Sequence, residues 1–306
     1  MKKLWLTVSV FILLFAIGCG KEQNDQTGES GVPDREIVIS GKKWTEQYIL
    51  PHILGKYIES KTDYQVEVKE GLGPTPILTQ ALKDGDIDIY VDYTGTGLLT
   101  VLKGSLKPED TKETVYERVK TEYKKQYNLV WTQPLGFNNT NAITLRKERA
   151  TELGVETASD LAAISDQLTF GADPPFFERE DGYKSLVKTY GFKFKDTMDL
   201  DTNIKYAALN EKKVDVINAF TTDGFLPRFD LKVVKDDQNL FPPYYAAPIV
   251  RQETLDQFPE LEKTLNELAD KIDENTMAKL NARVDIDRES PDKVAEEFLK
   301  EAGLIQ

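Results

Sequence analysis

Cysteine and histidine are almost missing from this chain, which contains one residue of each type among its 306. A lone cysteine cannot close an internal disulfide, which excludes a disulfide-stabilised scaffold. The same scarcity argues against a zinc site and against a Ser-His-Asp or Cys-His catalytic centre. His52 follows Pro51 in a stretch with helical periodicity, so we expect it at the surface or in a capping role. The sequence therefore predicts no metal, no cofactor and no catalytic residue.

A hydrophobic run long enough to span a membrane is missing too. The longest, residues 4–17, is interrupted by two hydroxyl residues and falls short of the ~20 residues that a spanning helix needs. Two lysines precede this run and Gly18-Cys19-Gly20 follows it, which is the order of a secretory signal peptide.

Cys19 stands directly after the apolar run, and its setting resembles a bacterial lipobox, although Ala16 occupies a position where leucine is usual. In such signals the cysteine becomes the lipidated, palmitate-bearing first residue of the mature protein. We expect residues 1–19 to be a lipoprotein signal peptide and the chain to be anchored on the outward face of the cell membrane. An ordinary cleaved signal with an incidental cysteine is the alternative. Residues 20–34 are polar and aperiodic, which predicts a flexible tether.

Basic residues are outnumbered by acidic ones, 39 against 52, and the formal net charge is −13. Nucleic-acid binding requires a basic face, so this balance opposes it. After the tether about 270 residues remain, enough for two lobes of ordinary size.

Short apolar strands and amphipathic helices alternate along this body, which predicts an α/β fold with mostly parallel sheets. Expected strands lie at 37–39, 65–69, 87–91, 129–131, 142–145, 168–171 and 214–219. Expected helices lie at 45–58, 77–83, 113–127, 182–190 and 204–210, and residues 255–306 are mainly helical with a break at Ser290-Pro291. In such folds ligands bind beyond the carboxyl ends of strands.

The loops after these strands carry aromatic and cationic side chains in an unusual density. They are 41–47 (GKKWTEQ), 92–97 (DYTGTG), 136–141 (GFNNTN), 173–182 (DPPFFEREDG), 219–224 (AFTTDG) and 241–245 (FPPYY). Each alone is explained by core packing or solvated charge, and Gly71-Leu72-Gly73-Pro74 is explained by a turn, since it lacks the Lys-Ser/Thr pair of a P-loop.

Taken together, these loops resemble the substrate-binding proteins of ABC importers for glycine betaine, choline, carnitine and related osmoprotectants. The matching stretches are 41–47, 71–73, 92–96, 221–224 and 241–244, and the resemblance extends over 37–306. It implies a periplasmic-binding-protein-like clamshell of two lobes joined by two crossovers. It also implies binding without chemistry, a small quaternary-ammonium ligand, and permease subunits of an importer as partners.

The resemblance further implies a box of side chains around the trimethylammonium head, at Tyr93, Asn141, Phe220 and Tyr244. Aromatic faces attract such a cation, which has no conventional hydrogen bond to offer. Phe220 replaces a tyrosine common in the family, and Asn141 replaces an aromatic residue. Trp44 and Tyr245 are the candidates to supply that wall.

The family pattern also places a lysine, an arginine and a hydroxyl donor at the carboxylate end of the ligand. These positions correspond to Lys42, Arg179 and Thr96. An arginine can hold a carboxylate through two parallel hydrogen bonds, so this set favours a zwitterion over choline.

We therefore expect lobe one at 35–138 and 242–306, lobe two at 139–241, and a monomer. Two other functions stay open at this point: a solute-binding protein that signals to a membrane receptor, and an extracytoplasmic α/β enzyme, which the missing nucleophile–base pair disfavours.

Overall fold

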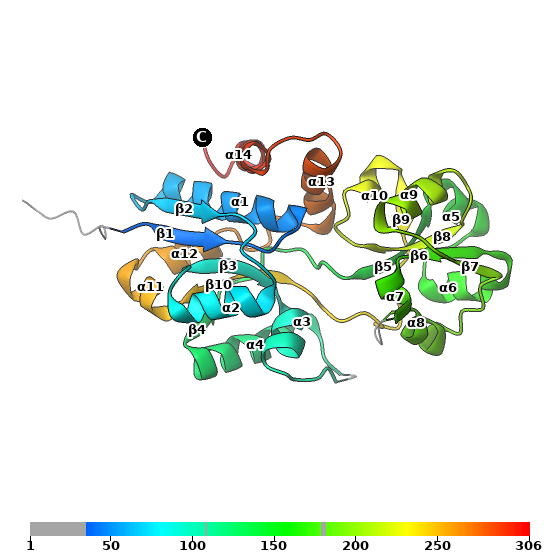
Figure 1. Ribbon diagram of the computed structural model, residues 1–306, viewed down its shortest axis with the longest axis horizontal. Helices are drawn as coiled ribbons and strands as arrows, with labels where there is room; N and C mark the ends of the chain where they lie inside the picture. Colours follow the sequence, from blue (N-terminus) through cyan, green and yellow to red (C-terminus); the bar gives the residue numbers. More distant parts are fainter. Residues whose placement is uncertain (1–34, 108, 179–181) are drawn as a thin grey trace, which may run out of the picture. The chain divides into compact units, whose positions relative to one another are not determined.

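The computed structural model describes residues 35–107, 109–178 and 182–306. Within these residues the chain forms two five-stranded sheets flanked by helices, which confirms the α/β fold and its two lobes (Figure 1). The signal peptide with Cys19, the 20–34 tether and Arg179 lie outside the described residues. In the part that is described, no helix has the length and apolarity to cross a membrane.

The first sheet has the strand order β2-β1-β3-β10-β4. β1, β2 and β3 are parallel, whereas β10 is antiparallel to both β3 and β4. This lobe comprises β1 (Ile37–Ser40), α1 (Thr45–Lys61), β2 (Val66–Lys69), α2 (Thr75–Asp84), β3 (Ile89–Tyr93), α3 (Thr94–Thr96) with a π-helical turn (Gly97–Val101), α4 (Lys112–Tyr127), β4 (Leu129–Trp131), β10 (Ala246–Arg251), α11 (Gln252–Gln257), α12 (Leu261–Asn266), α13 (Glu274–Asp285) and α14 (Pro291–Glu301).

The second sheet repeats this plan in the order β7-β6-β8-β5-β9. β6, β7 and β8 are parallel, whereas β5 is antiparallel to both β8 and β9. This lobe comprises β5 (Asn141–Arg146), α5 (Lys147–Leu153), α6 (Ala158–Ala163) with a 3₁₀ turn (Ser165–Gln167), β6 (Thr169–Ala172), α7 (Pro174–Glu178), α8 (Tyr183–Tyr190), β7 (Asp196–Asp199), α9 (Thr202–Asn210), β8 (Val216–Phe220), α10 (Phe225–Arg228) and β9 (Leu231–Val233).

One strand in each sheet runs against the other four, and each reversed strand is attached to a crossover. β5 is the first strand after the chain leaves the first sheet, and β10 is the first strand after it returns. The expected mostly parallel sheets are therefore present, with a single reversal in each. Because a reversed strand starts where its parallel neighbours end, both crossovers enter their sheets at the edge where ligands bind in such folds.

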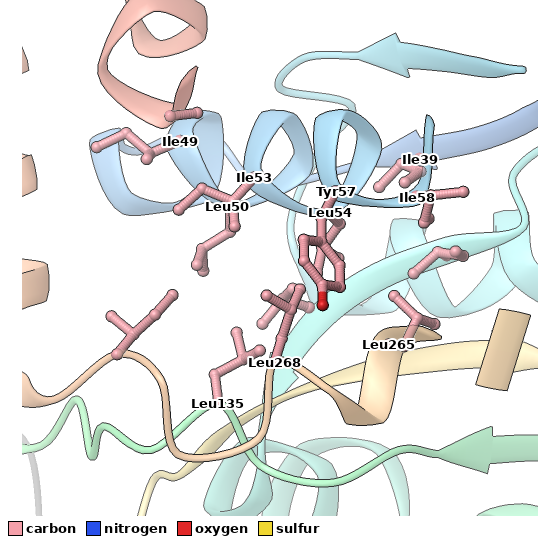
Figure 2. Packing of buried hydrophobic residues seen from close by; sticks show 14 of the residues in the cluster. Ile39, Ile49, Leu50, Ile53, Leu54, Tyr57, Ile58, Leu135, Leu265 and Leu268 are labelled. Carbon is pink, nitrogen blue, oxygen red and sulfur yellow. The ribbon is translucent and has the colours of Figure 1, made fainter. Parts of the chain in front are cut away.

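The core of the first lobe forms around α1, whose apolar residues recur at helical spacing and are all buried, as the sequence predicted. Figure 2 shows this face packing toward the sheet and toward α12 and the segment after it. The labelled residues are Ile39, Ile49, Leu50, Ile53, Leu54, Tyr57, Ile58, Leu135, Leu265 and Leu268. His52 lies on the outer side of this helix, with its Nε2 2.7 Å from Glu70.

Several strand boundaries differ from the sequence prediction by one or two residues. β3 ends at Tyr93 rather than Val91, β8 ends at Phe220, and β5 begins at Asn141. These end residues pair across the sheet, Tyr93 with Ala246 and Asn141 with Phe220, and such tertiary pairing is not visible in local periodicity. β7, β9 and β10 were not predicted, and at β10 Pro248 disfavours a central strand. Its carbonyl nevertheless accepts a hydrogen bond from the Thr132 main-chain N–H at 3.0 Å.

Candidate ligand-binding site

Three segments of the first lobe meet at one edge of its sheet. β1 and β3 are parallel, so the loop after β1, with Lys42 and Trp44, lies at the edge where β3 ends in Tyr93. β10 starts at the same edge, since Ala246 pairs with Tyr93, and Tyr244 precedes that start by two residues. The strand register therefore places these residues at one edge of the first sheet.

Lys42 is buried at this edge, with 2% of its surface exposed. Its ammonium lies 2.5 Å from Asp92 Oδ1. The same nitrogen lies 5.1 Å from the Trp44 ring centroid and 4.8 Å from that of Tyr93. The two rings are nearly parallel, at 18°, with their centroids 6.2 Å apart. One cationic side chain thus already contacts two aromatic faces, within the ~6 Å at which such contacts are attractive.

Tyr93 is held from its hydroxyl end by a second buried acid. Its hydroxyl donates to Glu46 Oε1 and accepts from Gln47 Nε2 at 3.0 Å. Asn139 Nδ2 also donates to Glu46, at 3.0 Å. Burial raises the pKa of Glu46 above its usual value, although hydrogen bonds from Tyr93 and Asn139 act to lower it. The ring of Tyr93 is therefore fixed by polar contacts at both its hydroxyl and its main chain, where Asp92 Oδ1 accepts from its N–H at 2.8 Å.

Tyr244 packs its ring directly over Gly95. A Cβ added at Gly95 would lie 2.7 Å from Tyr244 Cε1, a distance that real Cβ atoms essentially never show. Glycine is therefore required at this turn, so that the ring can approach the main chain. Thr96 closes the same turn and is half-buried. Tyr93, Thr96 and Tyr244 are thus brought together around a single turn, between β3 and the start of β10.

Asn141 and Phe220 face each other at the corresponding edge of the second sheet, where they are register partners on β5 and β8. Phe220 is one of the few large apolar side chains left exposed, at 43%, the same fraction as Trp44. Directly opposed residues on antiparallel strands have their side chains close together. The structure therefore places both sequence-predicted residues of lobe two side by side, with an aromatic ring accessible.

A buried polar cluster supports this second edge. Lys205 Nζ lies 2.7 Å from Asp173 Oδ2 and donates to Asn218 Oδ1 at 3.1 Å. Beside it, the half-buried carboxylate of Asp223 accepts from the Tyr206 hydroxyl and from the Phe220 N–H. Burial raises the pKa of Asp223. These contacts fix the ends of β6 and β8 and hence the position of Phe220.

The two crossovers are bonded to each other between these edges. Asn139 N–H donates to the Tyr244 carbonyl at 3.1 Å, and Asn138 Oδ1 accepts from the Tyr244 N–H at 2.6 Å. Thr140 Oγ1 donates to the Pro242 carbonyl at 3.0 Å. The crossovers therefore carry Tyr244 and Asn141 on one paired segment that joins the two predicted halves of the box.

Two residues of this site had no role in the sequence prediction. Asp92 and Glu46 are acidic and appeared only as members of matched loops. The available signal was their position: Asp92 directly precedes Tyr93 on a buried strand, and Glu46 starts a helix beside Trp44. Of the two candidates for an extra wall, Trp44 lies against Tyr93, whereas Tyr245 has the Lys112 ammonium over its ring at 5.4 Å.

Residues 35–301 match the family described as the substrate-binding domain of the ABC-type glycine betaine transport system. The chain belongs to this family. Its members are solute-binding components of transport systems, so the family supports the binding function and not an enzymatic one.

Relatives of this chain are described as binding different ligands. The chain is 38% identical to an ergothioneine transport permease/ergothioneine binding protein, EgtU, of Helicobacter pylori, over 90% of its own length. It spans about half of that longer protein, 49%. It is 35% identical to the carnitine transport binding protein OpuCC of Listeria monocytogenes, over 91% of both chains.

A solved structure described as a glycine betaine/carnitine/choline ABC transporter is similar in fold and sequence. Its TM-score is 0.84 and its identity 36%, over 89% of this chain and 100% of the other.

Proposed function

We propose that this protein captures a small quaternary-ammonium solute outside the cytoplasm and delivers it to the permease subunits of an ABC importer. Family membership over residues 35–301 is the observation that carries this proposal. Glycine betaine and carnitine are the first candidate ligands, because similar proteins are described as binding them. Ergothioneine is a further candidate, since EgtU is 38% identical to this chain.

The proposed box consists of Tyr93, Phe220 and Tyr244, with Asn141 as its polar wall. A trimethylammonium head is attracted to aromatic faces by about 2 kcal/mol or more when the contact is desolvated. The exposed ring of Phe220 and the fixed rings of Tyr93 and Tyr244 support this role. Trp44, stacked beside Tyr93 and 43% exposed, is a natural addition to the same box.

For the carboxylate end, we propose Arg179 and Thr96 as ligands; the family resemblance also implies Lys42, which is already paired with Asp92. The pairing of Lys42 with Asp92 means that a ligand carboxylate would have to share or displace that partner. Arg179→Ala should weaken the binding of glycine betaine far more than that of choline. Solution scattering with betaine present should show the lobes further apart than in the parent. If that variant keeps the parent's preference for glycine betaine over choline, Arg179 is not the carboxylate ligand.

The proposed lobe boundaries place the division within the paired crossovers, at 138/139 and 241/242. Cys19 is proposed as the lipidated residue that anchors the protein outside the membrane. Cys19→Ala should appear in the soluble fraction of the envelope or in the medium. Retention of a processed variant in membranes would contradict the anchor.

Calorimetry with glycine betaine, carnitine, choline and ergothioneine tests the function directly. Ligand at ~100 times its dissociation constant should add about 2.7 kcal/mol to the free energy of unfolding. Phe220→Ala should weaken binding by about 1–2 kcal/mol, whereas Phe220→Tyr, which keeps the aromatic face, should bind like the parent. Recovery of unaltered ligand distinguishes capture from turnover. Absence of binding to all four compounds would contradict the proposal.

A further inference from the structure

A buried cationic side chain of the protein lies against two rings of the proposed box. Lys42 is 2% exposed, and its ammonium lies 4.8 Å from the Tyr93 ring centroid and 5.1 Å from that of Trp44. A bound trimethylammonium head would use the same two rings. Because cation–π attraction is electrostatic, an uncompensated lysine beneath these rings would oppose a second cation placed on them.

Asp92 supplies the compensating charge. Its Oδ1 lies 2.5 Å from the Lys42 ammonium and also accepts from the Tyr93 N–H at 2.8 Å. Its Oδ2 accepts from the Tyr90 hydroxyl at 2.9 Å. The carboxylate is fully buried and is fixed by three donors, so its position relative to the rings is set by the fold. The other acid beside these rings, Glu46, lies at the hydroxyl end of Tyr93 and is not paired with Lys42 in the described contacts.

We propose that the buried Lys42–Asp92 pair forms a charge-neutral floor under Trp44 and Tyr93, and that Asp92 is a specificity-determining residue which allows this floor to accept a cationic head. Lys42 acts through this pair and positions the two rings, while the ligand carboxylate is held elsewhere. This inference rests on the proposed function, since it concerns the same box. It differs from the carboxylate clamp, in which Lys42 turns from Asp92 to the ligand.

Three variants separate the two roles: Lys42→Met, Asp92→Asn, and the double variant. Calorimetry is performed on each with choline, which carries a net positive charge, and with glycine betaine, which is a zwitterion. Asp92→Asn leaves the lysine charge uncompensated, so choline should bind at least tenfold more weakly, and the affinity for betaine should fall by a smaller factor. Lys42→Met leaves the carboxylate uncompensated, so choline should bind more tightly than to the parent. The double variant restores neutrality and should bring the ratio of the two affinities back to within about threefold of the parent.

Asp88→Asn is the matched control. Asp88 is a second buried aspartate, paired with Arg35 at 2.9 Å. It adjoins the start of β3, at the opposite end of this strand from Tyr93. It should lower the midpoint of unfolding and leave the choline-to-betaine ratio unchanged. This control separates a charge effect under the rings from general loosening of β3.

The clamp makes opposite predictions. If Lys42 holds the ligand carboxylate, Asp92→Asn frees the lysine and should raise the affinity for betaine. Lys42→Met should then leave the affinity for choline unchanged, and the double variant should fail to recover betaine affinity. That pattern, or a ratio that moves less than twofold in both single variants, overturns the charge-neutral floor while leaving the proposed function standing. If Asp92→Asn does not fold, the Lys42→Met and double variants still decide, because only the floor predicts tighter choline in the first and recovery in the second. Failure of the parent to bind either ligand would overturn the proposed function, and this inference with it.

Discussion

At the scale of single residues, the site depends on side chains that approach each other more closely than sequence patterns reveal. Tyr244 covers Gly95, Lys42 is enclosed by two rings and a carboxylate, and Tyr93 is fixed by Glu46. Apart from the contact of Lys42 with Trp44, these contacts join residues far apart in the chain. The consequences of each are therefore testable by substitutions that change one atom or one charge.

Gly95→Ala should displace the Tyr244 ring. The new Cβ would lie 2.7 Å from Tyr244 Cε1 and 2.9 Å from the Pro243 carbonyl oxygen. Overpacking of this kind typically lowers the free energy of unfolding by about 1–3 kcal/mol. We expect this loss together with weaker ligand binding, measured by denaturant unfolding and calorimetry.

The combination with Tyr244→Ala serves as a control for this contact. Removing the ring relieves part of the overlap, so the double variant should lose less stability than the sum of the two single losses. Strict additivity would show that Gly95 and Tyr244 do not restrict each other.

Glu46→Gln should change how stability depends on pH. Burial raises the folded-state pKa of Glu46 above the unfolded value near 4.5. A group shifted in this direction contributes its stabilisation below the unfolded pKa and loses it as pH rises toward the folded pKa, by up to about 1.4 kcal/mol per unit. The parent should therefore lose stability relative to the variant as pH rises above 4.5. Parallel curves in urea unfolding over this range would contradict the assignment.

At the scale of elements, most of the fold was predictable because apolar periodicity reports burial directly. α1 was predicted with its buried face, and the break at Ser290-Pro291 appears as the N-cap and first residue of α14. β10 was not predictable in this way, since Pro248 argues against a central strand. Its place between β3 and β4 is set by tertiary pairing, which outweighs local propensity.

α13 offers a test at this scale, because it reaches the second lobe. Asp273 caps its first turn by accepting from the Thr276 N–H at 2.7 Å, and Asn281 on the same helix donates to the Thr222 carbonyl at 2.8 Å. Asp273→Ala should lower the free energy of unfolding by about 0.5–2 kcal/mol, as loss of an N-cap does. Asp273→Asn keeps a hydrogen-bond acceptor, so its free energy of unfolding should fall much less.

The pH dependence of that cap has a definite sign. Hydrogen bonds from Thr276 lower the pKa of Asp273 below its usual value near 3.8. The stabilisation is thus present at neutral pH and is lost as pH falls through the folded pKa. The difference between the parent and Asp273→Ala, measured by thermal unfolding, should shrink at low pH. A difference that stays constant down to pH 2 would show that the charge of Asp273 has no part in the cap.

At the scale of the whole molecule, the two lobes share one plan, and each contributes one edge to the proposed box. The sequence predicted Tyr93, Tyr244, Asn141 and Phe220 because their loops match the family. Asn141 and Phe220 are register partners, and Tyr244 shares an edge with Tyr93 because β10 starts beside Tyr93. It did not predict the pairing of Lys42 with Asp92, since the charge of a lysine is visible in a sequence but its burial is not. The binding roles of these residues stay predictions.

The most direct test compares glycine betaine with 3,3-dimethylbutanoate, in which carbon replaces the quaternary nitrogen and the shape and carboxylate are retained. If aromatic faces recognise the positive charge, the compound with the uncharged head should lose about 2 kcal/mol of binding free energy. Calorimetry should then show that it binds roughly 30-fold more weakly than glycine betaine. Equal affinities for the two compounds would show that the site reads shape or carboxylate alone, and would contradict a cation-binding box.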